Sequence, residues 1–193
     1  LWMLAVATIF GVVIGKEIFG GTGYNIFNPA LTARAFLFFA YPSYMSGNKP
    51  WIAPIDGMSM ATPLLSKSSS LDIPYEWWNM FYGYIPGSIG ETSTLAILIG
   101  AVILLITKIG SWRTMLATFI GMCLTSFLLN QLSSIFNNPM LKLTALEHLV
   151  MGGFAFGMIF MATDPVSSAH TNKGRWMYGL LIGFMATVIR CVN

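Results

Sequence analysis

The first residues that could carry chemistry lie in a polar loop between two apolar stretches. The loop reads PIDGMSMATPLLSKSSS and covers residues 54–70. It contains one carboxylate, Asp56, which precedes the hydroxyl of Thr62 by six residues. Because an acid, several hydroxyls and prolines gather here in a chain that is otherwise very apolar, the loop is a candidate functional segment.

A second candidate is the glycine-rich segment GGTGYNIFNPALTARAF, residues 20–36. Its glycines loosen the backbone, and the amides of Asn25 and Asn28 each offer a donor and an acceptor. Two interpretations are open. The segment is a broken helix, which a membrane tolerates only where it is buried in protein or lines a cavity. Alternatively, it is an ordinary turn followed by a helix whose N-cap is Asn28.

Two acids lie beside apolar stretches, where an ionised group is costly unless it finds partners. Asp164 precedes Pro165, so it is either a helix stop in a solvated turn or a contact for a cation or cofactor. Glu91 lies just before Thr92 and Ser93, either of which can cap a helix. At that position the helix dipole favours an anion, and capping is the simplest interpretation.

The remaining reactive side chains form no recognisable site. His148 and His170 are isolated and share no metal-ligand spacing, so neither is predicted to bind a metal. Cys123 and Cys191 both lie in apolar runs and are interpreted as small buried hydrophobic residues. Because the basic residues form no patch, the sequence gives no support for nucleic-acid binding.

The composition indicates which elements position these residues. Of 193 residues, 55% are hydrophobic and 9% are charged, and the mean hydropathy is +0.70. A soluble domain carries about 25% charged residues. The chain is therefore predicted to be an integral membrane protein.

Hydropathy predicts an all-α polytopic helical bundle that forms a single transmembrane domain, because the apolar runs lack the alternation of a membrane barrel. A membrane helix needs about 20 apolar residues. The six predicted spans cover residues 1–15, 30–44, 94–109, 112–132, 146–163 and 176–192. Since the first and last runs begin and stop inside apolar sequence, we expect further helices beyond both ends.

The distribution of Lys and Arg predicts the orientation. The short links carry Lys16, Lys108, Arg113, Lys173 and Arg175, and the long loops carry Lys49, Lys67 and Lys142. The loop 45–93 is therefore predicted on the outer face. It contains an aromatic cluster that either marks the headgroup level or forms a stacking platform for a cofactor: Trp77, Trp78, Phe81, Tyr82 and Tyr84.

Five motifs occur in one order along nearly the whole chain: GYNIFNPALTARAFLFFAYP, DGMSMATP, GETSTLAILIGA, ATDPVSSAHTNKGRWMYGLLIG and RCVN. In this order and with these gaps, the sequence resembles the B-type membrane subunit of the sodium-translocating NADH:quinone oxidoreductases. The D-type subunit of the Rnf complex, an ion-pumping ferredoxin:NAD oxidoreductase, is the nearest sister. The resemblance implies a multi-pass protein of the bacterial inner membrane, with a urea-transporter-like architecture and broken helices.

The resemblance also implies a covalent FMN on the loop, which would face the periplasm. In the family, a flavin transferase uses FAD to join FMN through its phosphate to a threonine within an Asp-x-x-Ser/Thr-Gly-Ala-Thr pattern. The matching residues here are Asp56, Ser59, Ala61 and the acceptor Thr62. Met60 stands where glycine is usual, which restricts the backbone at a position that must bend into the transferase.

A non-covalent riboflavin is implied at the glycine-rich segment, where Asn25 and Asn28 would hydrogen-bond the flavin and Gly23 would admit its flat ring. Asp164 and Glu91 resemble family acids linked to cation passage or to flavin support. The implied function is electron transfer to quinone coupled to Na⁺ export, within a complex of several subunits in membrane lipid. The alternatives are an Rnf-type subunit and a solute channel or transporter without flavin.

Overall fold

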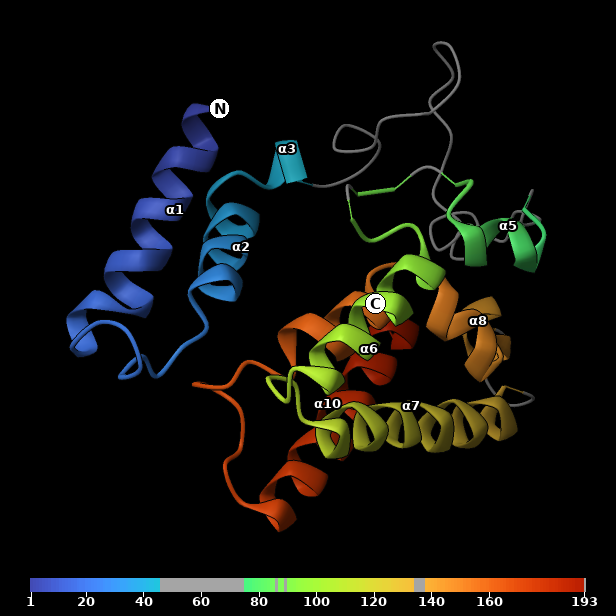
Figure 1. The fold of residues 1–193 in the computed structure, drawn as a ribbon. Coiled ribbons are helices and arrows are strands. Elements are labelled where there is room, and N and C mark those ends of the chain that lie inside the picture. The colour runs from blue at the N-terminus through green and yellow to red at the C-terminus, as the bar shows by residue number, and fades with distance from the viewer. Residues whose placement is uncertain (46–74, 86, 89, 134–137, 193) are drawn as a thin grey trace. The chain divides into compact units, whose positions relative to one another are not determined.

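The computed structural model of the protein (Figure 1) describes residues 1–45, 75–85, 87–88, 90–133 and 138–192. These residues form helices and turns and contain no β-strand, so the helical part of the predicted fold class is confirmed. The chain divides into two compact units. One comprises Leu1–Pro50 with Asp164–Ser168, and the other comprises Trp51–Thr163 with Ala169–Asn193.

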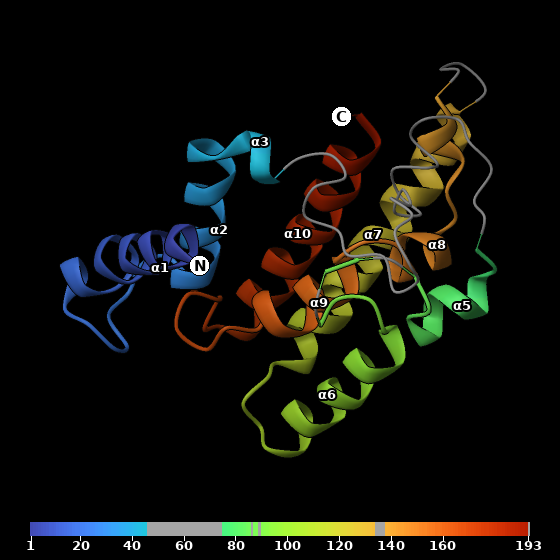
Figure 2. The same cartoon turned by 90° about the horizontal axis from the view of Figure 1, so that it is seen from above.

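The first unit is a helical hairpin. Its elements are α1 (Trp2–Gly15), the short 3₁₀ helix η1 (Glu17–Phe19), α2 (Pro29–Ala40) and α3 (Pro42–Met45). Helices α1 and α2 run in opposite directions and pack side by side (Figures 1 and 2). A Cβ atom on Gly11 would lie 2.6 Å from the carbonyl oxygen of Pro29, so glycine is what allows the two backbones to approach. Phe10 and Phe36 stack beside this contact, with ring centroids 4.5 Å apart.

The segment between the two helices follows the second sequence interpretation, a turn with an N-cap. Asn28 has extended backbone angles and its side chain accepts hydrogen bonds from the first turn of α2, while Pro29 occupies the first helical position. The predicted span 30–44 is divided, because α2 ends at Ala40 and Pro42 starts the separate helix α3.

The second unit is built around two 21-residue helices, α7 (Trp112–Leu132) and α10 (Asn172–Val192), which lie against one another. A Cβ atom on Gly179 would lie 2.7 Å from the carbonyl oxygen of Thr114, and one on Gly121 would lie 2.6 Å from that of Leu180. The GLLIG stretch of α10, which ends in Gly183, is a G-x-x-x-G pattern. Small residues at this spacing are typical of helices that pack closely within a membrane.

The predicted fifth span, 146–163, is an interrupted helix. Its parts are α8 (Ala145–Val150), α9 (Phe154–Phe156) and the π-helix η3 (Gly157–Met161). The break falls at the Gly152–Gly153 pair, where Gly152 has a φ of +63°. Met151 already has extended backbone angles and Gly152 is left-handed, so neither residue continues α8, which ends at Val150. The prediction of one continuous helix over this range is therefore wrong.

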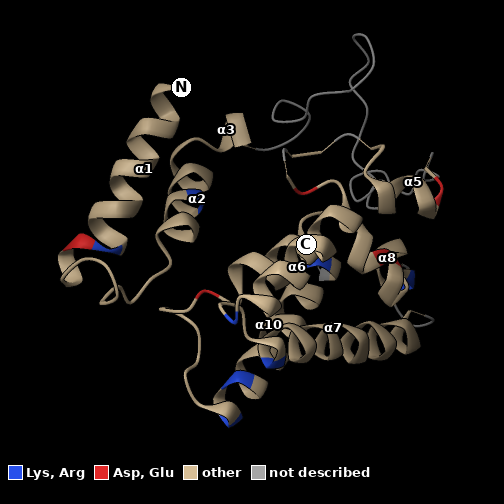
Figure 3. Ribbon diagram, viewed as in Figure 1, with Lys and Arg blue, Asp and Glu red and all other residues tan. Residues whose placement is uncertain are grey.

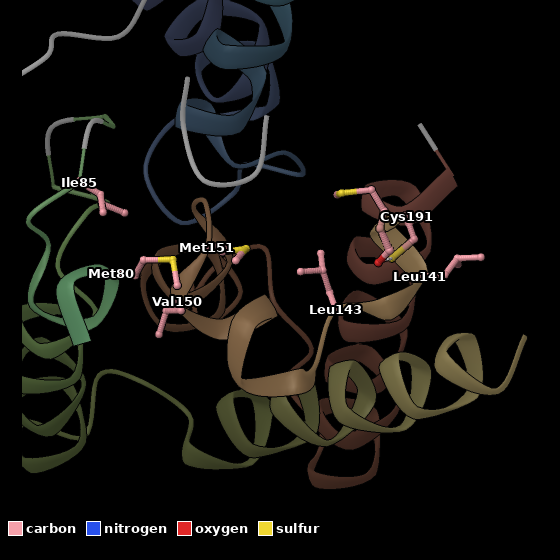
Figure 4. Packing of buried hydrophobic residues seen from close by; sticks show 8 residues of the cluster. Met80, Ile85, Leu141, Leu143, Val150, Met151 and Cys191 are labelled. Carbon is pink, nitrogen blue, oxygen red and sulfur yellow. Dashed lines mark hydrogen bonds between the residues drawn. The ribbon is translucent and has the colours of Figure 1, made fainter. Parts of the chain in front are cut away.

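Two buried apolar clusters support the second unit. Cluster 1, shown in Figure 4, comprises Met80, Ile85, Met140, Leu141, Leu143, Val150, Met151 and Cys191. Cluster 2 comprises Ile97, Ala101, Met115, Met122, Phe154, Ala155, Met158 and Ile159. Helix α5 (Trp77–Tyr82) packs Trp77 and Phe81 against cluster 1 and leaves Trp78, Tyr82 and Tyr84 exposed. The predicted aromatic cluster therefore has one face packed on cluster 1 and one face exposed.

Two helical stretches of the described chain, Trp2–Phe19 and Trp112–Leu132, are long and apolar enough to cross a membrane. Helices α2 and α6 (Thr94–Ile106) are apolar but shorter. Figure 3 shows that α1 and α6 carry no charged residue along their length, and that charge first appears at their ends and in the links. The prediction that all six ranges span the bilayer remains a prediction.

Candidate functional site

The sequence motif for covalent modification lies outside the described residues. Asp56, Ser59, Ala61 and Thr62 all fall in the range 46–74. Their assignment therefore rests on the sequence alone.

The turn between α1 and α2 brings Asn25 and Asn28 together with three glycines of positive φ. Gly20, Gly21 and Gly23 have φ values of 114°, 88° and 91°, a conformation that glycine adopts without steric cost. A Cβ atom on Gly23 would meet no heavy atom of the described residues within 4 Å. The backbone at Gly23 is therefore open to a neighbouring group.

The two asparagines are partly engaged in local hydrogen bonds. Oδ1 of Asn28 accepts from the backbone N–H of Ala30 at 2.9 Å and of Leu31 at 3.2 Å. Nδ2 of Asn25 donates to the carbonyl oxygen of Phe27 at 3.0 Å. Both side chains are half-buried. Within the described chain, one polar atom of each amide thus takes no part in these bonds. These atoms are Nδ2 of Asn28, a donor, and Oδ1 of Asn25, an acceptor.

Asp164 lies in the turn that follows the π-helix. Its Oδ2 accepts hydrogen bonds from the hydroxyl of Ser167 and from the backbone N–H of Ser167, the latter at 3.2 Å. This is the turn-forming arrangement predicted for an Asp-Pro helix stop. Residues Asp164–Ser168 belong to the same compact unit as the turn that carries Asn25 and Asn28.

Glu91 lies against the break between α8 and α9. The hydroxyl of Ser88 donates to its Oε2 at 3.3 Å. A Cβ atom on Gly153 would come within 2.6 Å of the same oxygen, so the missing side chain admits the carboxylate. The predicted cap of the following helix is Ser93, whose hydroxyl accepts from the backbone N–H of Ala96 at 3.3 Å. Glu91 is therefore placed by the glycine break, and Ser93 performs the capping.

The structure also assembles a polar cluster that the sequence analysis did not connect. The guanidinium of Arg190 donates to the carbonyl oxygen of His148 at 2.8 Å, and Nδ2 of Asn138 donates to that of Cys191 at 3.0 Å. Sγ of Cys191 lies 3.9 Å from Nε2 of His148 and 3.5 Å from the carbonyl oxygen of Met140. His148 and Cys191 are 43 positions apart, and no local motif signals their contact.

Apolar helices that pack through glycine, with polar groups confined to turns and helix breaks, are the features of a helical membrane protein. The comparisons specify the family: residues 1–193 match the NQR2, RnfD, RnfE family, and the chain belongs to it. The resemblance predicted from the five motifs is therefore confirmed.

The curated relatives include three proteins named as B subunits of Na(+)-translocating NADH-quinone reductases. The protein of Chromohalobacter salexigens is 56% identical over 197 residues, covering 100% of this chain and 47% of the relative. The proteins of Yersinia pestis and Ectopseudomonas mendocina are each 54% identical, over 202 and 198 residues, covering 100% of this chain and 48% and 49% of the relatives. The chain thus spans about half the length of the curated relatives it matches.

Proposed function

We propose that the chain is part of a flavin-carrying, electron-transferring subunit of a Na⁺-translocating NADH:quinone oxidoreductase in a bacterial inner membrane. The observation that carries the proposal is the motif Asp56-x-x-Ser59-x-Ala61-Thr62 in a chain that matches the family from end to end. The relatives' names specify NADH, quinone and Na⁺. The partners are the other subunits of the complex, quinone and the surrounding lipid.

In this proposal, Thr62 carries FMN as a phosphoester on the outer, periplasmic face. A flavin transferase catalyses attack of the threonine hydroxyl on the FMN phosphate of FAD. The new bond joins Oγ1 to that phosphorus, AMP leaves, and the hydroxyl proton is released. Bound flavin supplies the one- and two-electron chemistry, and the chain supplies attachment and position.

The test is in-gel fluorescence of the full-length protein after co-expression with a flavin transferase and denaturation. We expect a fluorescent band from the wild type and from the control Ser68→Ala, which removes a hydroxyl from the same loop. We expect no band from Thr62→Ala. A dark wild-type band, or a fluorescent Thr62→Ala band, would overturn the attachment and favour the flavin-free channel or transporter.

The proposal assigns a non-covalent riboflavin to the turn between α1 and α2. Its support is the chemistry of the turn: Nδ2 of Asn28 and Oδ1 of Asn25 take no part in the local bonds, and Gly23 leaves open space beside the backbone. A donor and an acceptor of this kind match the polar edge of an isoalloxazine or its ribityl hydroxyls. The role of the chain here is to bind and orient the ring.

The proposal assigns Glu91 and Asp164 to the cation pathway. Hard cations prefer oxygen ligands, and Glu91 offers a carboxylate at a helix break beside the hydroxyl of Ser88. Asp164 offers a second carboxylate in a turn, with its Oδ2 held by Ser167. Irregular backbone of this kind at membrane depth is tolerated where it lines a cavity or is buried in protein.

A further inference from the structure

We infer that Cys191 and His148 form a binding site for a soft monovalent metal cation, of the class of Cu(I), between the end of α10 and α8. The site is separate from the residues assigned above to flavin and to Na⁺. Its starting point is the 3.9 Å separation between Sγ of Cys191 and Nε2 of His148. Both residues come from the described part of the second unit.

The imidazole of His148 is buried without adequate hydrogen bonds. Its side chain is 1% exposed, and Nδ1 has no hydrogen-bond partner among the described residues. Nε2 lies near the sulfur of Cys191, which is itself 2% exposed and also lies against the carbonyl oxygen of Met140. The thiol can donate to the carbonyl oxygen of Met140, and its contact with Nε2 of His148 runs in the direction that the ring tautomer allows. Nδ1 is thus the ring nitrogen without a partner, whereas Nε2 is the one that faces the sulfur.

The separation of the two atoms is close to the span of one bridging metal ion. Metal–thiolate and metal–imidazole bonds are about 2.3 Å and about 2.0 Å long, so a collinear arrangement spans about 4.3 Å. With these bond lengths, a separation of 3.9 Å corresponds to a sulfur–metal–nitrogen angle of about 130°. The described residues contain no group of three or more His, Cys, Asp or Glu side chains that could hold a metal, so the site offers two strong ligands.

Two ligands and low polarity favour a soft monovalent ion. Met80, Met140 and Met151 belong to the same buried cluster as Cys191, so this cluster is rich in polarizable thioether groups (Figure 4). Thiolate, thioether and imidazole ligands suit Cu(I). A thiolate with a monovalent ion is neutral overall, whereas Zn²⁺ would leave a net positive charge close to the guanidinium of Arg190. An uncompensated charge in such surroundings is costly.

Binding requires no change of oxidation state. The S–H bond of Cys191 breaks, a bond forms between Sγ and Cu(I), and the proton is released to solvent. Nε2 of His148 donates its lone pair to the metal, and the proton of the neutral imidazole resides on Nδ1. The contact from Cys191 to the carbonyl oxygen of Met140 is lost. The hydrogen bond from Arg190 to the carbonyl of His148 holds α8 in register with α10.

The test is an anaerobic competition between the purified full-length protein in detergent and bicinchoninate, whose Cu(I) complex loses its colour when the protein takes the metal. The matched control is Cys123→Ser, which removes the other cysteine of this chain. We expect wild type and Cys123→Ser to take up one more equivalent than Cys191→Ser. Because loss of an outer-shell partner already costs about 10–100-fold in affinity, loss of the thiolate is expected to cost more than about 100-fold.

A second measurement identifies the imidazole. Copper K-edge absorption of the 1:1 complex should show sulfur scattering together with the outer-shell scattering of one imidazole, and His148→Asn should lose the latter. Size-exclusion profiles and a second variant, Cys191→Ala, separate loss of ligand from loss of fold. Equal copper uptake by wild type and both Cys191 variants means an adventitious ion only. No uptake by the wild type means that the thiol–imidazole contact is simply packing. Either result overturns the site.

Discussion

Substitutions of Asn28 can separate the two roles of its side-chain amide, helix capping and flavin binding. Its oxygen caps α2, and its nitrogen is the proposed donor to riboflavin. Replacing an N-cap Asn by Ala costs about 0.5–2 kcal/mol. Because Oδ1 accepts two backbone hydrogen bonds, at 2.9 and 3.2 Å, we expect Asn28→Ala to lie near the middle of this range, at about 1 kcal/mol. Asn28→Asp keeps the acceptor and adds a negative charge at the helix N-terminus, which is worth about 0.3–1 kcal/mol in favour of the helix.

The assay combines thermal unfolding in detergent with chromatography of the flavin that is released by acid. Both variants are expected to lose riboflavin, because both lack the N–H₂ donor, while only Asn28→Ala is expected to lose stability. Ser111→Ala is the matched control. It removes the cap of α7, where the hydroxyl accepts from the N–H of Thr114 at 3.4 Å, and should lose stability without losing riboflavin. Full riboflavin content in Asn28→Asp would refute the donor role and leave Asn28 as a cap alone.

Two further predictions concern glycines. A Cβ atom on Gly183 would clash with the carbonyl oxygen of Thr118 and lie 2.6 Å from the backbone nitrogen of Met122. Gly183→Ala is therefore expected to destabilise the packing of α10 on α7 by about 1–3 kcal/mol in detergent unfolding. Gly157→Ala, whose Cβ meets nothing within 4 Å among the described residues, should have little effect, and equal losses would contradict the close-packing argument. Gly153→Ala should displace the carboxylate of Glu91 and lower Na⁺-stimulated quinone reduction in the assembled complex. Normal Na⁺ stimulation in that variant would remove Glu91 from the proposed cation pathway.

Hydropathy and capping rules were sufficient to place the long helices α1, α6, α7 and α10. Helix α7 has the bounds predicted for residues 112–132, because a long apolar run between a serine cap and a polar end leaves no alternative register. The caps at Asn28 and Ser93 followed from side-chain chemistry next to the first helical residue. These features are local, and a single sequence contains all that is needed to predict them.

The interrupted helix could not be placed by the same reasoning. Residues 146–163 are apolar throughout, except for Glu147, His148 and Thr163, so hydropathy gives one continuous span. The break depends on a positive φ at Gly152 and on the carboxylate that fills the space beside Gly153. A glycine pair in a membrane helix is equally compatible with close helix packing. Only the approach of Glu91 from a segment 62 positions earlier distinguishes the two uses.

Four buried threonines of the second unit are satisfied by their own helices. The hydroxyls of Thr118, Thr125, Thr163 and Thr187 each donate to the carbonyl oxygen four residues earlier, at 2.5–2.8 Å. Such a bond satisfies the hydroxyl as a hydrogen-bond donor, so the hydroxyl requires no ligand.

The polar groups that retain capacity within the described chain are therefore the informative ones. Nδ2 of Asn28 and Oδ1 of Asn25 remain after the turn is built. The buried atoms without a partner among the described residues are Nδ1 of His148, Oγ1 of Thr114 and Nε1 of Trp77. A buried polar group with no partner costs about 1–3 kcal/mol, so a fold that retains such a group needs a compensating contact. This reasoning separates the four threonines that bond their own helices from the residues at which a flavin or a metal should be sought. It also explains why composition alone could not find them, since the distinction lies in which atoms are already bonded.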